Sequence, residues 1–222
     1  VGTPDGKVLT SKISGLTSLD VSGQSITNLT GIQDFVALQS LNCSGNQLTA
    51  LDVSKNTALK WLVCNSNQLT ALDVSKNVAL LQLKCYSNQL TTLDVTNNSA
   101  LKFIDCSSNQ LTSLNVSQNV SLTELYFYSN QLTSLDVSKN IVLTKLHCYS
   151  NQLAALDVSN NSALLELNCY SNQLTALDVS KNTALINIDC SSNQLTVLNV
   201  KNGRNLATYN FKNNPNLYCI QI

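Results

Sequence analysis

One phrase of 21 residues recurs along most of the chain and limits what the chain can fold into. Each copy carries an apolar slot that falls at Cys43 and then every 21 residues as far as Cys190, with Phe127 once in place of cysteine. Val21 precedes this series by 22 residues, and Phe211 ends it. Near-identical units bury apolar residues only by stacking on their neighbours. The repeat therefore predicts one elongated domain of about ten coils.

Each 21-residue unit consists of two similar halves. Segment 59–67 reads LKWLVCNSN and segment 69–77 reads LTALDVSKN, so both follow the pattern LxxLx(apolar)xxN. Apolar and polar residues alternate over the centre of each half, which is typical of a short strand with one buried face. Neither half leaves room for a helix of three turns. We predict a mostly β, right-handed solenoid with short parallel strands on two faces and little or no helix.

Two asparagine columns accompany the strands. An asparagine amide both donates and accepts hydrogen bonds, so an inward-turned one can satisfy backbone groups of its own turn and of the neighbouring coil. We interpret both columns as scaffold. The first column is Asn46, Asn67, Asn88, Asn109, Asn130, Asn151, Asn172, Asn193 and Asn214; the second is Asn56, Asn77, Asn98, Asn119, Asn140, Asn161, Asn182 and Asn202.

The charge content argues against several classes of partner. Charged residues make up 12% of the chain, about half of the ~25% that is usual, and the formal net charge is zero. The sequence thus lacks the basic footprint of a nucleic-acid-binding protein or of one attracted to anionic membranes. It also contains no apolar run of ~18 residues. We predict no nucleic-acid partner and no direct membrane insertion.

The repeat resembles a known family. LxxLxCxxNxL is similar to the leucine-rich-repeat signature LxxLxLxxNxL, and LxxLDVSxN resembles the second half of the nested 21-residue bacterial variant called IRREKO. The opening segment 6–49 is similar to the first coils of internalin-like proteins of Bacteroidetes. The closing segment 213–222, NNPNLYCIQI, resembles the end of secreted flavobacterial members.

The resemblance implies a leucine-rich-repeat domain over residues 1–222. Within it we expect irregular N-terminal coils over 1–40 and a capping segment over 201–222. Relatives of this kind carry a helical cap before the first coil and further domains after the last, so the chain is expected to come from a longer extracellular or cell-surface protein of bacteria.

The eight cysteines could form disulfides, bind metal or pack in the core. Val21, Phe127 and Phe211 occupy the repeat cysteine slot, and neither a disulfide nor a metal site tolerates such replacements. The 21-residue spacing also lacks the C-x₂₋₄-C pairs of zinc sites. We predict seven reduced and unreactive core thiols, no metal site and no cofactor. The state of Cys219, which lies outside the column, stays open.

Catalytic patterns are weak. His147 is the only histidine and has no nucleophile at a diagnostic spacing, while Glu124 and Glu166 lie two coils, or roughly 10 Å, apart. The chain has neither a glycine-rich phosphate loop nor an HExxH motif. We predict that it is not an enzyme and has no catalytic residue.

One outward column is acidic. Carboxylates stacked about 5 Å apart repel each other by roughly 1 kcal/mol per pair in water, so hydrogen bonds, nearby lysines or bound cations must offset the repulsion. One carboxylate per coil offers too few oxygen ligands for calcium, and we therefore favour hydrogen bonds to the flanking Ser and Thr. The column is Asp52, Asp73, Asp94, Asp136, Asp157 and Asp178, with Asn115 and Asn199 in its other two places.

The outward positions of the two half-coils differ in variability. Those of the LDV half repeat Ala, Ser or Thr, then Asp or Asn, then Ser or Thr, whereas those of the cysteine half change from coil to coil. Tyr and Trp are enriched in binding hot spots, although stacked tyrosines can also simply stabilise a sheet. We predict a ligand-binding surface on this face, made by Trp61, Tyr86, Phe103, Tyr126, Tyr128, Lys145, His147, Tyr149 and Tyr170.

Two functional hypotheses remain. In the first, the chain is a monomeric, non-enzymatic recognition module that binds a protein or a glycan through this variable face, which the family resemblance places on the concave side. In the second, it is a passive spacer within a larger surface protein, with the coils forming a rod roughly 45 Å long.

Overall fold

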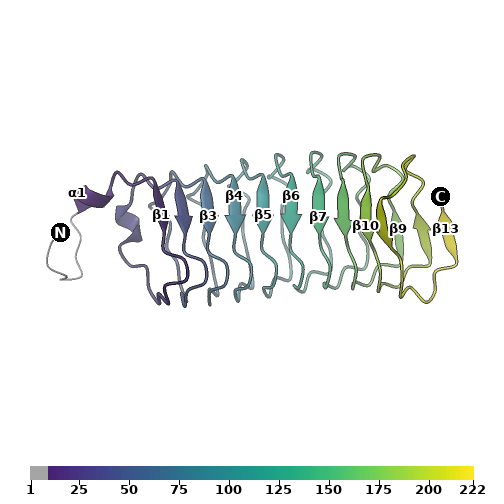
Figure 1. The fold of residues 1–222 in the computed structure, drawn as a ribbon, viewed down its shortest axis with the longest axis horizontal. Helices are drawn as coiled ribbons and strands as arrows, with labels where there is room; N and C mark the ends of the chain where they lie inside the picture. Colours follow the sequence, from purple (N-terminus) through teal and green to yellow (C-terminus); the bar gives the residue numbers. More distant parts are fainter. Residues whose placement is uncertain (1–9) are drawn as a thin grey trace.

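The computed structural model describes residues 10–222 as one stack of coils, with α1 (Thr10–Ile13) at one end of the stack and β13 (Cys219–Gln221) at the other (Figure 1). The part of the predicted N-terminal coils in residues 1–9 lies outside the described residues. The main sheet contains ten parallel strands in the order β1-β2-β3-β4-β5-β6-β7-β8-β10-β12. They are β1 (Ser18–Asp20), β2 (Ser40–Asn42), β3 (Trp61–Val63), β4 (Gln82–Lys84), β5 (Phe103–Asp105), β6 (Glu124–Tyr126), β7 (Lys145–His147), β8 (Glu166–Asn168), β10 (Asn187–Asp189) and β12 (Thr208–Asn210).

Pairing within the sheet follows the repeat without a slip. Leu62 pairs with Leu83, and Leu83 with Ile104, so equivalent residues of neighbouring coils lie side by side. This register is obligatory because a shift by one residue would turn every apolar side chain outward. Helical segments are confined to α1 (Thr10–Ile13) and the 3-10 turn η1 (Ile32–Asp34) among the described residues. The predicted mostly β solenoid of about ten coils is confirmed.

The second face carries fewer strands than the alternation predicted. Within the described residues, strands on this face occur only in the last coils, as β9 (Ala176–Asp178), β11 (Val197–Asn199) and β13 (Cys219–Gln221). There the coils approach closely enough for backbone bonds, such as Val179 N to Asn199 O at 2.9 Å. The pattern LDV predicts which residue faces inward, but it does not set the spacing between coils.

The first asparagine column joins neighbouring coils as predicted. In Asn67, Oδ1 accepts a bond from the backbone N–H of Leu48 in the preceding coil at 3.0 Å, and Nδ2 donates to the carbonyls of Cys43 and Cys64. In the second column, Nδ2 of Asn77 donates to the carbonyls of Val53 and Asn56. Most amide oxygens of the second column are buried and accept no hydrogen bond from the described residues. They are Oδ1 of Asn56, Asn77, Asn98, Asn119, Asn140, Asn161 and Asn182.

The seven repeat cysteines are free and buried in one apolar core, as predicted. Burial disfavours the thiolate and raises the pKa of each of them, to about 12 for Cys43 and for Cys190. Thiols with such pKa values are poor nucleophiles at neutral pH. Cys219 is also free and is partly exposed.

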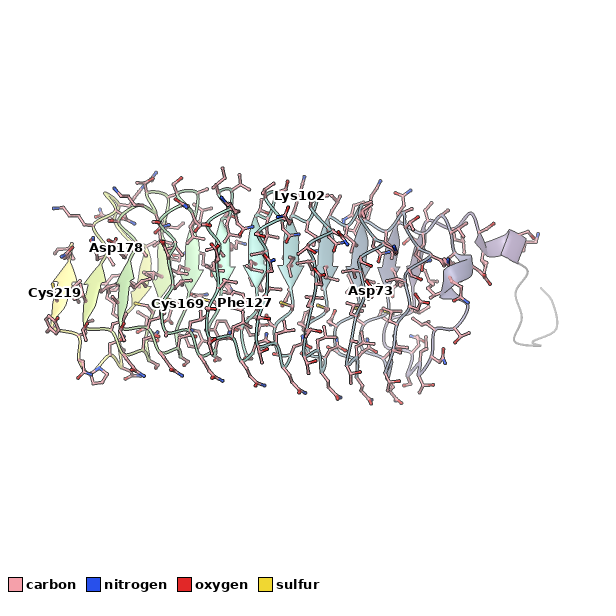
Figure 2. All side chains as sticks on the ribbon, turned by 180° about the vertical axis from the view of Figure 1, so that it is seen from behind. Asp73, Lys102, Phe127, Cys169, Asp178 and Cys219 are labelled. Atoms are coloured by element: carbon pink, nitrogen blue, oxygen red, sulfur yellow. The ribbon has the colours of Figure 1, made fainter. Side chains whose placement is uncertain are left out.

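Phe127 lies in the same column of the stack as Cys169 (Figure 2) and is fully buried. A ring in a cysteine position would be expected to bulge its coil or to face a smaller neighbour. The strand ladder is undisturbed on both sides, since Leu125 pairs in register with Ile104 and Leu146. Leu135 on the opposite wall of the same coil is partly buried, and the equivalent leucines of the other repeats are up to 8% exposed. The ring is therefore accommodated without a change in strand pairing.

One turn position has a left-handed backbone in every repeat. It is glycine at Gly23 and Gly45, and asparagine at Asn213. The remaining coils place serine there, with φ between 52° and 55°, at Ser66, Ser87, Ser108, Ser129, Ser150, Ser171 and Ser192. A side chain at such a φ costs roughly 1 kcal/mol or more relative to glycine.

Candidate functional site

The outward side of the main sheet carries the variable residues. In β2 to β8 and in β10 the middle side chain is buried and its two neighbours are half-buried or exposed, because successive residues of a strand point to opposite faces. We call the variable strip the first and third residues of these strands together with the residue that follows each buried core position. All nine predicted site residues lie on this strip.

Three tyrosines of the strip stack on one another. Tyr149 lies between Tyr128 and Tyr170, with ring centroids 4.4 Å and 4.3 Å away and ring planes within 10° of parallel. Each ring follows a buried core residue in consecutive coils, so the strand spacing of about 4.8 Å brings the rings into contact. Burial and the two flanking tyrosines raise the pKa of the Tyr149 hydroxyl. The stack covers both ring faces of Tyr149 and one face each of Tyr128 and Tyr170, so the middle ring presents only its edge and hydroxyl group to a ligand.

A second aromatic group lies beside the stack. Tyr126 contacts Phe103 at a centroid distance of 5.3 Å and meets His147 edge-on at 4.6 Å. His147 in turn lies 6.4 Å from Tyr149, which joins the two groups. Lys84 places Nζ 5.3 Å from the Phe103 ring centre, within range of a cation–π contact.

Charged side chains hold this aromatic group in place. The Tyr126 hydroxyl donates to Glu124 Oε2 at 2.5 Å, and burial together with this bond raises the Tyr126 pKa. Lys145 Nζ lies 3.6 Å from Glu124 Oε1. His147 Nε2 lies 2.9 Å from Glu166 Oε1, to which Asn168 Nδ2 also donates at 3.2 Å. Partly buried polar contacts of this kind orient a surface before a ligand arrives.

The structure thus brings together seven of the nine predicted residues and leaves two apart. The seven are Phe103, Tyr126, Tyr128, Lys145, His147, Tyr149 and Tyr170, which we call the aromatic cluster. Trp61 is 41% exposed on β3, and Tyr86 is half-buried after β4; neither makes a ring contact within residues 10–222. The prediction omitted Lys84, Glu124, Glu166 and Asn168, although each occupies a variable position.

A polar pocket of about 360 Å³ adjoins the cluster on its C-terminal side. Its lining includes the buried Ile188 of β10 and the exposed Tyr209 of β12. Its walls are the outward residues of β8, β10 and β12, namely Glu166, Asn168, Asn187, Asp189, Thr208 and Asn210. Asp189 and Asn210 were not among the predicted site residues, although Asp189 occupies a variable position.

The acidic column on the other face is held by local hydrogen bonds, as favoured above. The carboxylate of Asp94 accepts bonds from the hydroxyl and the backbone N–H of Thr96, at 2.7 Å and 2.9 Å, and these bonds lower its pKa. Asn115 accepts the same bond from the N–H of Ser117. An uncharged amide thus replaces the carboxylate without loss of the turn. No cluster of three or more potential metal-binding side chains (His, Cys, Asp or Glu) occurs within residues 10–222.

Comparisons with known proteins give structural relatives only. No protein-family model matches the chain, and no curated protein does so. The functional domain of InlJ from Listeria monocytogenes, described as including a cysteine ladder, is 38% identical with a TM-score of 0.85, and the match covers 96% of this chain and 54% of that one. A leucine-rich-repeat protein of Leptospira interrogans is 26% identical with a TM-score of 0.71, over 87% and 51% of the two chains.

A third similar structure is more distant in sequence. The leucine-rich-repeat ectodomain of a plant membrane receptor kinase from Arabidopsis thaliana, in complex with CASPARIAN STRIP INTEGRITY FACTOR 2, has a TM-score of 0.67 and 21% identity over 87% of this chain and 29% of that one. It shows the fold alone. The chain spans about half the length of the two bacterial proteins above. Its repeat, its buried cysteine column and these similarities make the chain an internalin-like leucine-rich-repeat solenoid.

Proposed function

We propose that the chain is a non-enzymatic recognition module of a secreted or cell-surface bacterial protein and binds a protein partner through the variable strip. The observation that carries this proposal is the contrast between the two faces. The LDV face repeats the same small and acidic residues, whereas the strip collects seven varied residues into one contiguous aromatic cluster with fixed polar contacts. We further propose that the chain acts as a monomer and that its nested repeats are those of secreted Bacteroidetes proteins.

The geometry of the aromatic cluster favours a protein over a glycan. A sugar ring packs on an exposed aromatic face, but Tyr149 is covered on both faces by Tyr128 and Tyr170. What the stack offers is a row of ring edges and hydroxyl groups, which suits the mixed apolar and polar surface of a protein. The plant ectodomain of similar fold is itself seen in complex with CASPARIAN STRIP INTEGRITY FACTOR 2.

An array experiment tests the proposal. The wild-type chain and the variant Tyr126→Ser/Tyr149→Ser are applied to an array of extracellular proteins and to a glycan array. The matched control is Val78→Ser/Ile141→Ser, which removes two exposed apolar side chains outside the strip. We expect protein ligands that bind the wild type and the control, and bind the strip variant at least tenfold more weakly, as hot-spot tyrosines would require.

Three outcomes would count against the proposal. Ligands that bind both variants equally would exclude the strip, and binding to glycans alone would exclude a protein partner. If the folded chain binds nothing on either array, the passive spacer becomes the better description, since a rod of stacked coils separates its ends without a ligand.

A further inference from the structure

The polar pocket beside the aromatic cluster is rich in hydrogen-bond acceptors. Asp189 Oδ1 accepts from the N–H and the hydroxyl of Ser191, at 3.0 Å and 2.6 Å, and Oδ2 accepts from Asn210 Nδ2 at 3.1 Å. Glu166 Oε1 accepts from Asn168, while its Oε2 has no bond within the described residues. Asp189 is therefore oriented by amide and hydroxyl donors, whereas Glu166 also has His147 Nε2 at 2.9 Å from its Oε1.

Most donors of the pocket are already used within its own walls, and the exception is the Asn187 amide, whose Nδ2 has no bond within the described residues. The amides of Asn168 and Asn210 donate to the two carboxylates, and the hydroxyl of Thr208 donates to Asn187 Oδ1 at 2.7 Å. What remains for a ligand is mostly lone pairs on carboxylate oxygens, each of which accepts more than one bond. A sugar hydroxyl or an anion would need donors here, whereas a guanidinium or ammonium group supplies only donors.

The positions of the cationic side chains on the strip also favour a ligand cation in this pocket. Lys145 lies beside Glu124, and His147 beside Glu166, but no cation lies within ion-pair distance of Asp189 among residues 10–222. A ligand cation in the pocket would lie among lining residues that include both carboxylates, of which Asp189 has no cation of its own within the described residues.

The distance between pocket and aromatic cluster adds a constraint. The pocket is centred on β10, two coils beyond the strand that precedes Tyr149, so about 10 Å separate it from this middle ring of the stack at the usual strand spacing, whereas the Tyr170 ring is one coil away. An extended peptide covers about 3.3 Å per residue. We propose that the strip recognises an extended protein segment in which an arginine or lysine, seated in this pocket, lies three to four residues from an aromatic or large apolar side chain on the cluster. This inference rests on the proposed function and specifies the chemistry of its partner.

Synthetic peptides test the inference directly. The probes are fluorescein-labelled Gly/Ser peptides with one Trp and one Arg, separated by one to six positions, and the same peptides with Gln in place of Arg. We expect the tightest binding at a separation of three or four positions, and about tenfold weaker binding of the Gln peptides. Asp189→Asn should remove most of the preference for Arg and leave the Gln peptides unaffected.

The chain provides matched controls. Asparagine occupies the position of Asp189 in neighbouring coils, at Asn168 and Asn210, so Asp189→Asn preserves a turn that the fold already uses. Asp105→Asn makes the same change at the equivalent position of β5, away from the pocket, and should leave the Arg preference intact. Equal binding of Arg and Gln peptides, no binding of any peptide, or an equal effect of Asp105→Asn would overturn the inference. A strip-dependent protein partner on the arrays would still support the proposed function.

Discussion

Phe127 shows that this core holds a ring at a cysteine position without a change in strand pairing. Seven coils place a cysteine at this position, and the one coil with a ring buries it fully and pairs in register on both sides. Packed interiors respond to a change of even one methylene group, so neighbouring side chains must adjust to a change from thiol to ring. The strand itself stays in place because hydrogen bonds to both neighbours fix it.

The first prediction concerns this exchange. Phe127→Cys should lower the free energy of unfolding by only about 1–2 kcal/mol, less than the 3–5 kcal/mol typical of truncating a buried ring. The reason is that seven other coils of this core already pack around a cysteine at this position, so this coil should close around the smaller side chain. Urea denaturation measures the change, with Leu125→Ala in the same coil as the control at about 2–5 kcal/mol. A loss for Phe127→Cys as large as that for Leu125→Ala would show that the coil does not close.

The second prediction concerns the left-handed turn. Ser87→Gly should stabilise the protein by roughly 0.5–1 kcal/mol, because the backbone there has a φ of 53° and glycine removes the side-chain strain. Gly45→Ala, at the equivalent turn with a φ of 65°, should destabilise by a similar amount. Thermal denaturation of both variants, with Ser87→Ala as the control for the hydroxyl group, checks the pair. Destabilisation by Ser87→Gly would mean that the serine makes a compensating interaction.

At the scale of one coil, side chains rather than strands secure the second face. Asn77 bonds two carbonyls of the preceding coil, and Asp73 caps its own turn by accepting the N–H of Ser75. The two side chains have different roles: the buried amide joins neighbouring coils, and the exposed carboxylate shapes a turn within one coil. This division explains why Asn115 can replace aspartate, since either side chain offers the oxygen that the turn needs.

The third prediction follows from the acidic column. Hydrogen bonds lower the pKa of these carboxyl groups in the folded chain, as for Asp73 and Asp94. A folded pKa below the unfolded value of about 3.9 contributes stability above that value, and the contribution is lost as the pH falls through the folded pKa. Urea denaturation midpoints should therefore decrease below about pH 4.

Exchanges between aspartate and asparagine isolate this effect. Asp94→Asn should reduce the loss of stability in acid, and Asn115→Asp should increase it, each measured as a difference from the wild type at pH 7 and at pH 3. Asp105 on the other face acts in the opposite sense, because burial raises its pKa and its contribution to stability grows as the pH falls. Identical acid profiles for the two variants would contradict the role given to the column.

For the whole molecule, stability should accumulate coil by coil. Every strand of the main sheet pairs only with its immediate neighbours along the stack, so the fold is a one-dimensional array. In such an array whole repeats can be added or removed without changing the pairing of the remaining coils. Part of a repeat cannot be removed, because each coil packs its buried residues against the next in a fixed register.

The fourth prediction uses this property. Deletion of residues 88–108 removes one 21-residue repeat and joins Ser87 to Asn109, which preserves the repeat phase. The variant should fold cooperatively, with a urea m-value about a tenth lower because one of about ten coils is missing. Deletion of residues 88–97 removes about half a repeat and should prevent cooperative folding. Loss of folding in the 21-residue deletion would show that this coil has a particular role.

The sequence by itself determined the repeat length, the inward and outward sides of each half-coil and the buried state of the seven cysteines. These features follow from the order of residues along the chain. Alternation with period two determines which residues face inward, and a position shared by Cys, Val and Phe cannot require a disulfide or a metal ligand. The variable strip was predicted for the same reason, because its positions are defined by parity alone.

The tertiary structure decided which of the strip residues meet. The rings of Tyr128, Tyr149 and Tyr170 became a parallel stack, while Trp61 remained apart, and the pocket beside β10 brought Glu166 and Asp189 together. Strands on the second face likewise formed only where neighbouring coils approach within hydrogen-bonding distance. These contacts depend on side-chain torsion angles and on the distance between residues that are 21 or more positions apart in the chain. The sequence pattern within one coil specifies neither quantity.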